Sequence, residues 1–224
     1  MIELIASSLQ DAKRIERGGA DRIELVSALS EGGYTPSMGL VTAIIGQIRI
    51  PTAVMLRPNR SDFYYDRHEI EILRRDAVYF NQVGVKHVVL GILSPDGLPD
   101  IRRMEQVLDG TNLQLTFHRA IDSSVDVIKS VRYLNNYDRV SHILSSGGPG
   151  KAMANIATLK QMIELSNKRI IVGSGVDATN VQSLQEALEG LTYDVHAGGA
   201  VRGGDVRAEV SQQEVRDFVG LIKR

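Results

Sequence analysis

Four strand-like segments of this chain each carry a charged or titratable side chain among apolar neighbours. Glu24 lies in RIELV, Arg57 ends TAVMLR, His118 ends LQLTFH and His196 lies in YDVHA. A charge is costly to bury unless it is paired, so each of these positions needs a reason. Histidine and glutamate together in one cavity could exchange protons with a substrate, and arginine could hold the substrate's anionic group.

These residues are set in a repeated pattern of short apolar segments and amphipathic helical ones. Helical periodicity is clearest over 8–17, 67–83, 178–188 and 210–223. The strand segments begin about 27 residues apart, a spacing typical of strand–helix units, and they are IELIA from 2, RIELV from 22, TAVMLR from 52, KHVVLG from 86, LQLTFH from 113, VSHILS from 140, RIIVG from 169 and YDVHA from 193. Eight such units predict a parallel (β/α)8 TIM barrel formed by one domain, residues 1–224, with a doubly wound sheet as the alternative.

The strand period of two predicts which side chains enter the barrel. In residues 113–118 the apolar positions turn toward the helices and His118 turns inward. The same parity turns inward a polar set from four further strands: Glu3, Glu24, Arg57 and His196. Barrel active sites lie at the C-terminal ends of the strands, so we expect one cavity there. Arg57 is the expected counter-charge of Glu24, and a purely structural Glu24–Arg57 pair is the alternative.

Glycine-rich turns follow the last two strand segments. Barrel enzymes commonly bind phosphate with the loops at this position, through backbone N–H groups at a short helix N-terminus. The glycines concerned are Gly173, Gly175, Gly198 and Gly199. We therefore expect a small anionic ligand, a phosphate or a carboxylate, while simple turn glycines remain the alternative. The segment SSGGPGKA from 145 lacks the first glycine and the final Ser/Thr of a P-loop.

Composition restricts the classes of function. The net charge of −1 gives no reason to expect nucleic acid or an anionic membrane as partner. No signal-peptide pattern or long apolar run occurs, which predicts a soluble, cytoplasmic protein. The chain has no cysteine, which excludes disulfides, thiolate metal sites and a cysteine nucleophile. We expect structural roles for His87 and His142 and a surface position for His68.

Five blocks of the sequence resemble one known family. GGADRIELVSALSEGGYTPS, RPNRSDFYY and TFHRAID closely resemble signature blocks of the CutC copper homeostasis protein family, and SSGG and HAGGAVR are looser matches. The resemblance runs from residue 1 to about residue 202. It implies a TIM barrel, a cytoplasmic location, a homo-oligomer that is often a dimer, and a link to copper tolerance. No reaction is attached to the family.

The resemblance also implies site residues. The family's polar barrel-mouth positions match Glu24, Ser27, Glu31, Arg57, Arg60, His118, Arg119, Asp122 and His196. Of these, Glu24, His118, Asp122 and His196 are the catalytic candidates, and the other five join the four glycines as substrate-binding candidates. The family often has cysteines where this chain has Ile5 and Val26. Because thiolates select Cu(I), we expect no thiolate copper site.

Three functions remain open on the sequence. The first is a protein of copper homeostasis, with copper implied by the resemblance alone. The second is a barrel enzyme, of lyase, isomerase or hydrolase type, that acts on a small anionic metabolite. The third is a non-catalytic binder that uses the same barrel mouth. No metal site is assigned, although His118, His196 and Glu24 together could hold a divalent ion.

Overall fold

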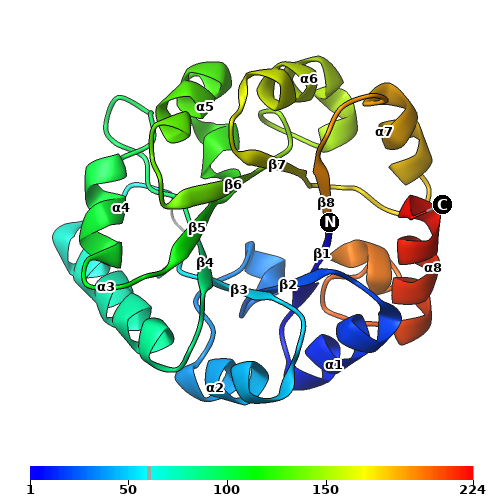
Figure 1. Cartoon of the computed structure of the whole chain (residues 1–224), viewed down its shortest axis with the longest axis horizontal. Helices are drawn as coiled ribbons and strands as arrows, with labels where there is room; N and C mark the ends of the chain where they lie inside the picture. Colours follow the sequence, from blue (N-terminus) through cyan, green and yellow to red (C-terminus); the bar gives the residue numbers. More distant parts are fainter. Residues whose placement is uncertain (60–61, 224) are drawn as a thin grey trace.

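Eight parallel strands close on themselves in the structure, a computed structural model that describes residues 1–59 and 62–223 (Figure 1). They are β1 (Ile2–Ala6), β2 (Arg22–Leu25), β3 (Thr52–Met55), β4 (His87–Leu90), β5 (Gln114–Phe117), β6 (Val140–Ser145), β7 (Arg169–Val172) and β8 (Asp194–Ala197). Each strand pairs with its neighbours in sequence, and β8 pairs with β1, where Glu3 lies opposite His196. This closure confirms the predicted (β/α)8 barrel and excludes a doubly wound sheet, whose edge strands stay open.

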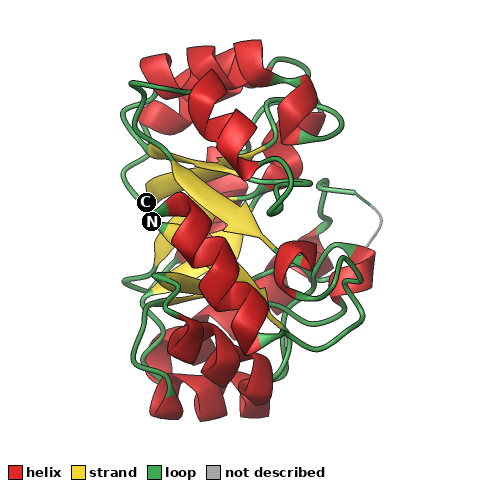
Figure 2. Ribbon diagram, turned by 90° about the vertical axis from the view of Figure 1, so that its right-hand side faces the viewer, coloured by secondary structure: helices red, strands yellow, loops and turns green. Residues whose placement is uncertain are grey.

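A ring of helices surrounds the strands (Figures 1 and 2). In the described residues these are α1 (Leu9–Gly18), α2 (Met38–Gln47), α3 (Arg67–Gln82), α4 (Ile101–Leu108), α5 (Val127–Asn135), α6 (Ile156–Leu165), α7 (Val181–Ala187) and α8 (Gln212–Ile222). The four helices with the clearest periodicity are α1, α3, α7 and α8, each within three residues of the predicted bounds. Within residues 1–59 and 62–223, no helix has the length and apolar character needed to cross a membrane.

Local sequence signals set the helix ends. Ser8 caps α1 by accepting a hydrogen bond from the Asp11 N–H, and Gly19 ends the helix in the left-handed conformation at φ 92°. Asp66 and Glu69 form a reciprocal capping box at the start of α3. Such caps fix where each strand–helix unit turns, and so where the loops at the barrel mouth begin.

Two apolar clusters lie on the two faces of the barrel wall. The larger one fills the space between strands and helices and includes Leu113, Leu115 and Phe117. The smaller one lies inside the barrel and consists of Ile5, Val26, Ala53, Met55 and Val89. The period-two prediction for residues 113–118 is therefore confirmed, and the polar positions that share its inward parity enter the barrel.

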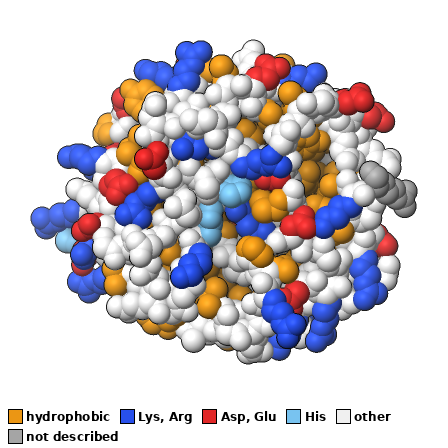
Figure 3. Space-filling view, viewed as in Figure 1, with side chains coloured by type: hydrophobic (Ala, Val, Ile, Leu, Met, Phe, Trp, Pro, Cys, Tyr) orange, Lys and Arg blue, Asp and Glu red, His pale blue; other side chains and the backbone are white. Residues whose placement is uncertain are grey.

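A polar layer lies below the inner cluster, toward the N-terminal ends of the strands. Arg22 Nη2 donates to Thr116 Oγ1 at 3.2 Å, and His87 Nε2 lies 2.7 Å from the same oxygen. The ring of His142 packs edge-on against that of His87, with centroids 5.3 Å apart. The face drawn in Figure 3 shows histidine beside basic side chains at its centre. His87 and His142 thus have the structural surroundings expected of them, and His68 is exposed.

Candidate functional site

A cavity of about 870 Å³ opens at the C-terminal ends of the strands. Its lining gathers most of the residues singled out in the sequence: Glu24, Glu31, Arg57, His118, Arg119, Gly175, His196, Gly198 and Gly199. Four of these side chains come from four different strands or their ends, so the barrel closure is what brings them together. Ser27, Asp122 and Gly173 are described residues outside this lining, and Arg60 lies outside the described residues.

Glu24 is buried inside the barrel without the arginine that the sequence suggested. Among the described residues no ion pair joins Glu24 to Arg57; the nearest charged partner is His196, whose Nε2 lies 3.9 Å from Glu24 Oε2. Glu24 is opposite Ala53 in the β2–β3 ladder, and Arg57 comes four residues later, about 13 Å along the strand. The predicted Glu24–Arg57 pairing is therefore wrong. Burial raises the pKa of Glu24 to about 7.

Glu3 takes the counter-charges that Glu24 lacks. Arg22 Nε donates to Glu3 Oε2 at 2.5 Å, and His196 Nδ1 donates to Glu3 Oε1 at 2.8 Å. The strand register explains both contacts, because Glu3 lies opposite Arg22 in β2 and opposite His196 in β8. Burial opposes ionisation, yet Arg22 and His196 lower the pKa of Glu3 to about 2. Sequence reasoning missed Arg22, although its parity with Glu24 marks it as inward-facing.

His196 lies between the two carboxylates. A carboxylate only accepts hydrogen bonds, so the contact with Glu3 places the proton of a neutral imidazole on Nδ1 and turns the bare Nε2 toward Glu24. Burial disfavours a charged ring, but the nearby Glu24 and Glu3 outweigh it and raise the pKa of His196. His196 is thus hydrogen-bonded to the buried Glu3 and lines the cavity together with Glu24.

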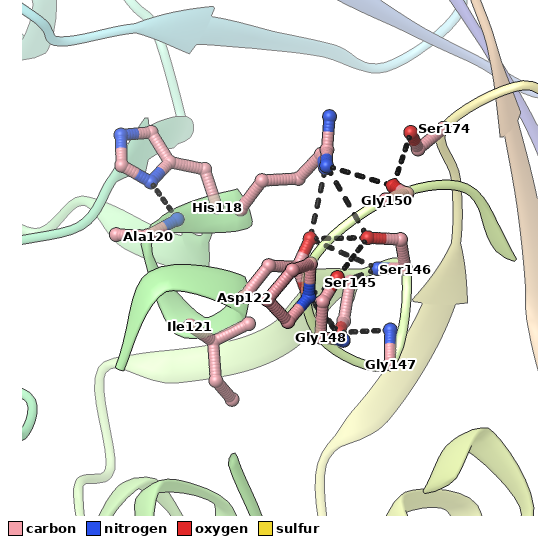
Figure 4. Close-up of polar contacts among 12 residues, drawn as sticks. His118, Ala120, Ile121, Asp122, Ser145, Ser146, Gly147, Gly148, Gly150 and Ser174 are labelled. Carbon is pink, nitrogen blue, oxygen red and sulfur yellow. Dashed lines mark hydrogen bonds and ion pairs between the residues drawn. The ribbon is translucent and has the colours of Figure 1, made fainter. Parts of the chain in front are cut away.

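His118 is the second buried histidine of the cavity, with different chemistry. Its Nδ1 accepts a hydrogen bond from the Ala120 N–H at 3.2 Å (Figure 4), so a neutral ring carries its proton on Nε2. Burial, reinforced by the nearby Arg57, lowers the pKa of His118 to about 3. The ring is therefore neutral at physiological pH. This favours a hydrogen-bond donor role for His118 over the acid–base role expected from the sequence.

Gly91 makes room for that ring. A Cβ atom at residue 91 would lie 2.4 Å from His118 Nδ1 and 2.8 Å from the Ala120 Cβ, closer than atoms can approach without displacement. Gly91 follows β4, and the side chain that requires a glycine there comes from the end of the neighbouring strand, β5. No local pattern in the sequence indicates this contact.

Arg57 is held in place at the mouth by aromatic rings. Its guanidinium lies 5.2 Å from the Phe63 ring centroid and 5.6 Å from that of Tyr34, and Nη1 donates to the Gly33 carbonyl at 3.4 Å. Stacking of this kind suits arginine more than lysine, because the guanidinium is planar and weakly hydrated. Arg57 therefore presents a fixed positive charge at the cavity wall.

Asp122 is a buried anchor and not a cavity residue. Its carboxylate accepts from the Ser145 and Ser146 hydroxyls, at 2.5 and 2.7 Å, and from the Ser146 and Gly148 N–H groups, at 3.1 and 3.2 Å (Figure 4). Arg119 Nε donates to it at 2.8 Å. These bonds tie the loop after β6 to the turn after β5. Asp122 therefore positions the two loops and does not line the cavity, although the sequence analysis named it as a catalytic candidate.

Three of the four predicted anion-binding glycines have packing or backbone reasons of their own. A Cβ at Gly173 would lie 2.8 Å from Leu144 and 3.1 Å from His196, and one at Gly198 would lie 2.9 Å from Ile5. Gly175 has φ +72°, which favours glycine. Ser27 pairs its backbone with that of Tyr34 across the loop after β2. These features account for Gly173, Gly175 and Gly198 without a ligand, whereas a Cβ at Gly199 would meet no atom closer than 3.7 Å. Anion binding at the glycine loops stays a prediction.

One group of side chains has metal-ligand geometry in the described part of the chain. Glu3, Glu24 and His196 each offer a ligand atom, and these atoms lie within 4.8 Å of one another. His118 is outside this group, so the combination considered from the sequence is replaced by one that includes Glu3. Ile5 and Val26, which the resemblance aligns with cysteines, belong to the apolar inner cluster. The residues present therefore do not fit a thiolate Cu(I) site.

Comparison with known proteins gives one consistent result. The model of the CutC family matches residues 1–200. A family protein CutC from Xanthomonas campestris pv. campestris (strain 8004) is 34% identical over 241 residues, covering 99% of this chain and 98% of that protein. The human copper homeostasis protein cutC homolog is 37% identical over 191 residues, covering 85% and 69%. The CutC crystal structure from Streptococcus agalactiae superposes with a TM-score of 0.77 at 30% identity, covering 88% and 98%.

Proposed function

The chain belongs to the CutC family, and we propose that it takes part in copper homeostasis through its barrel-mouth cavity and not as a thiolate carrier of Cu(I). The family match supports the first half of this proposal, since relatives that cover most of the chain carry that name. The cavity supports the second half. It holds Glu24, His118 and His196, whereas Ile5 and Val26 offer only hydrocarbon.

Two experiments test this role separately. Deleting the gene should lower growth at raised copper, and a plasmid copy should restore it; a copy carrying Glu24→Gln should not. Titration with Cu(I) against a competing chelator, without oxygen, should show no stoichiometric binding that survives nanomolar competition. Tight stoichiometric Cu(I) binding would show that the protein is a copper carrier. Unchanged copper tolerance after deletion would remove the copper role itself.

We further propose that the protein acts in the cytoplasm as a homo-oligomer. The absence of cysteine supports the location, and the family resemblance supports both the location and the oligomer. Analytical ultracentrifugation and cell fractionation are the direct measurements. A monomer at micromolar concentration, or recovery outside the cytoplasm, would contradict it.

A second candidate function is an enzyme acting on a small anionic metabolite. The supporting observation is that Glu24 and His196, 3.9 Å apart, share one cavity with the arginines Arg57 and Arg119. A carboxyl group with a pKa near 7 can take up and return a proton at physiological pH, which a general acid–base catalyst must do. The arginines would hold the substrate's phosphate or carboxylate by forked hydrogen bonds. A lyase, an isomerase and a hydrolase all remain compatible with this arrangement.

Ligand-induced stabilisation tests the anion site. Millimolar phosphate or a phosphosugar should raise the unfolding temperature of the wild type, because a ligand that binds only the native state stabilises it. Arg57→Ala should abolish the shift, whereas Arg75→Ala, on the exposed side of α3, should retain it. Equal shifts in both variants would exclude Arg57 as the anion-binding group. Turnover of the stabilising compound would then separate an enzyme from a binder.

A further inference from the structure

We propose that Glu24 and His196 bind a divalent first-row metal ion, of which Zn²⁺ is the probe, and that Glu3 orients the imidazole for this purpose. The site would face the cavity described above. It depends on the geometry of that cavity but not on copper homeostasis, so the two proposals can fail independently.

The separation of the two ligand atoms fits one shared ion. Glu24 Oε2 and His196 Nε2 lie 3.9 Å apart, too far for a hydrogen bond between them. Two atoms that each lie about 2.1 Å from a zinc ion can be at most about 4.2 Å apart. An ion can therefore enter between them with only small side-chain rotations.

The ring of His196 already has the orientation that a metal ligand requires. Its Nδ1 donates to Glu3 Oε1 at 2.8 Å, so in the neutral ring the lone pair of Nε2 is directed toward Glu24, and a metal ion would bind in place of the second proton of the charged ring. Metal-binding histidines commonly donate their second ring N–H to a carboxylate in this way, which fixes the tautomer and makes the ligand more basic. The other oxygen of Glu3 accepts from Arg22 at 2.5 Å, so Glu3 positions the ligand and does not need to bind the ion.

Glu24 supplies an independent indication of a missing partner. The side chain is 4% exposed, and its Oε1 accepts no hydrogen bond from any residue that the structure describes. A buried carboxylate oxygen without a partner is costly, and the nearest strand arginine, Arg22, is already bonded to Glu3. A cation bound by both oxygens of the Glu24 carboxylate would satisfy Oε1 as well as Oε2. Since both Glu24 and His196 line the cavity, the remaining coordination positions would be open to water or to an anionic ligand.

The donor atoms select the class of metal. One imidazole nitrogen and one carboxylate, without sulfur, suit Zn²⁺ and neighbouring divalent ions and do not suit Cu(I). A site with two thiolates at positions 5 and 26 would have the opposite preference and would select Cu(I). The metal chemistry of this chain would therefore differ from that of relatives with cysteines there.

The experiment is equilibrium dialysis of the full chain, first stripped with a chelator, against Zn²⁺. We expect one ion per chain for the wild type, with at least a hundredfold weaker binding in both Glu24→Gln and His196→Asn. Glu3→Gln should weaken binding by about 10- to 100-fold, the usual effect of removing a carboxylate that orients a metal-bound histidine. His68→Asn, which removes an exposed imidazole on α3, is the matched control and should bind like the wild type.

Thermal unfolding of the metal-free proteins shows whether a variant that loses Zn²⁺ binding is still folded. Glu24→Gln should be at least as stable as the metal-free wild type, because the amide removes a buried charge with an unpartnered oxygen. Loss of Zn²⁺ binding with retained stability supports the site. The proposal is overturned if the wild type binds no Zn²⁺, if Glu24→Gln and His196→Asn bind it unchanged, or if His68→Asn alone removes it.

Discussion

His118 should make the protein lose stability in mild acid. Burial holds the pKa of the folded His118 at about 3, whereas an unfolded chain returns it to the ordinary value of about 6.5. Between these values the unfolded state binds a proton that the folded state does not. Stability therefore falls as the pH falls through this window, and the contribution of His118 is fully retained only above pH 6.5.

The size of the effect follows from the two pKa values. One proton bound only by the unfolded state changes the free energy of unfolding by about 1.4 kcal/mol per pH unit. Integrated from pH 6.5 to pH 4.5, His118 should cost about 2 kcal/mol. His87, whose pKa burial lowers to about 3, changes stability in the same direction, whereas Glu24, whose pKa burial raises to about 7, changes it in the opposite direction, so the contribution of His118 is measured by comparing a variant with the wild type.

Urea unfolding of the wild type and of His118→Asn, measured at intervals from pH 6.5 to pH 4.5, isolates the contribution of His118 to the pH dependence of stability. Asparagine keeps an acceptor near Nδ1 for the Ala120 N–H but has no titratable group. The variant should lose about 2 kcal/mol less stability than the wild type over the interval, whatever its stability at pH 6.5. His68→Asn, at an exposed position, should parallel the wild type. Parallel curves for His118→Asn and wild type would show that the folded His118 accepts a proton, and its donor role would be refuted.

Three further substitutions probe the supports of the site. Gly91→Ala should destabilise the protein by about 1–3 kcal/mol in urea unfolding, because its methyl group would overlap the His118 ring; an unchanged midpoint would show that the ring can move aside. Asp122→Ala should cost at least about 3 kcal/mol and increase amide hydrogen exchange at Ser146 and Gly148, which lose their acceptor; unchanged exchange there would contradict the anchoring role. Arg22→Met should cost about 3–5 kcal/mol by leaving Glu3 without its cation, and replacing both residues by apolar ones should recover most of that loss.

The fold was accessible from the sequence because its signals are local. Eight short apolar runs at regular spacing, with amphipathic segments and caps such as Ser8 and Gly19 between them, determine strand–helix units one at a time. Closure then follows from their number and their parallel order. The inward direction of Glu24, His118 and His196 was equally accessible, since it depends only on the strand period of two.

The partners of these side chains were not accessible, because they depend on distances across the barrel. Arg57 has the right parity to meet Glu24 but lies four residues further along its strand than the residue opposite Glu24. Asp122 has the right position in the loop, but its carboxylate turns to the Ser145–Gly148 segment, away from the cavity. Gly91 is required by a ring from another strand. These contacts depend on strand register, side-chain direction and close approach between strands. None of these three features produces a periodic pattern in the sequence.

The distribution of charge inside the barrel distinguishes a site from a structural ion pair. Two carboxylates, Glu3 and Glu24, enter the same region, but Arg22 bonds to only one of them, and His196 donates its Nδ1–H to that same one. A purely structural arrangement would pair each buried charge, because an unpaired buried charge lowers the stability of the fold. Glu24 instead keeps one oxygen without a protein donor among the described residues and lies on the wall of the cavity. A buried, uncompensated carboxylate in that place is best explained by a proton, a cation or a cationic group of a ligand that completes it during function.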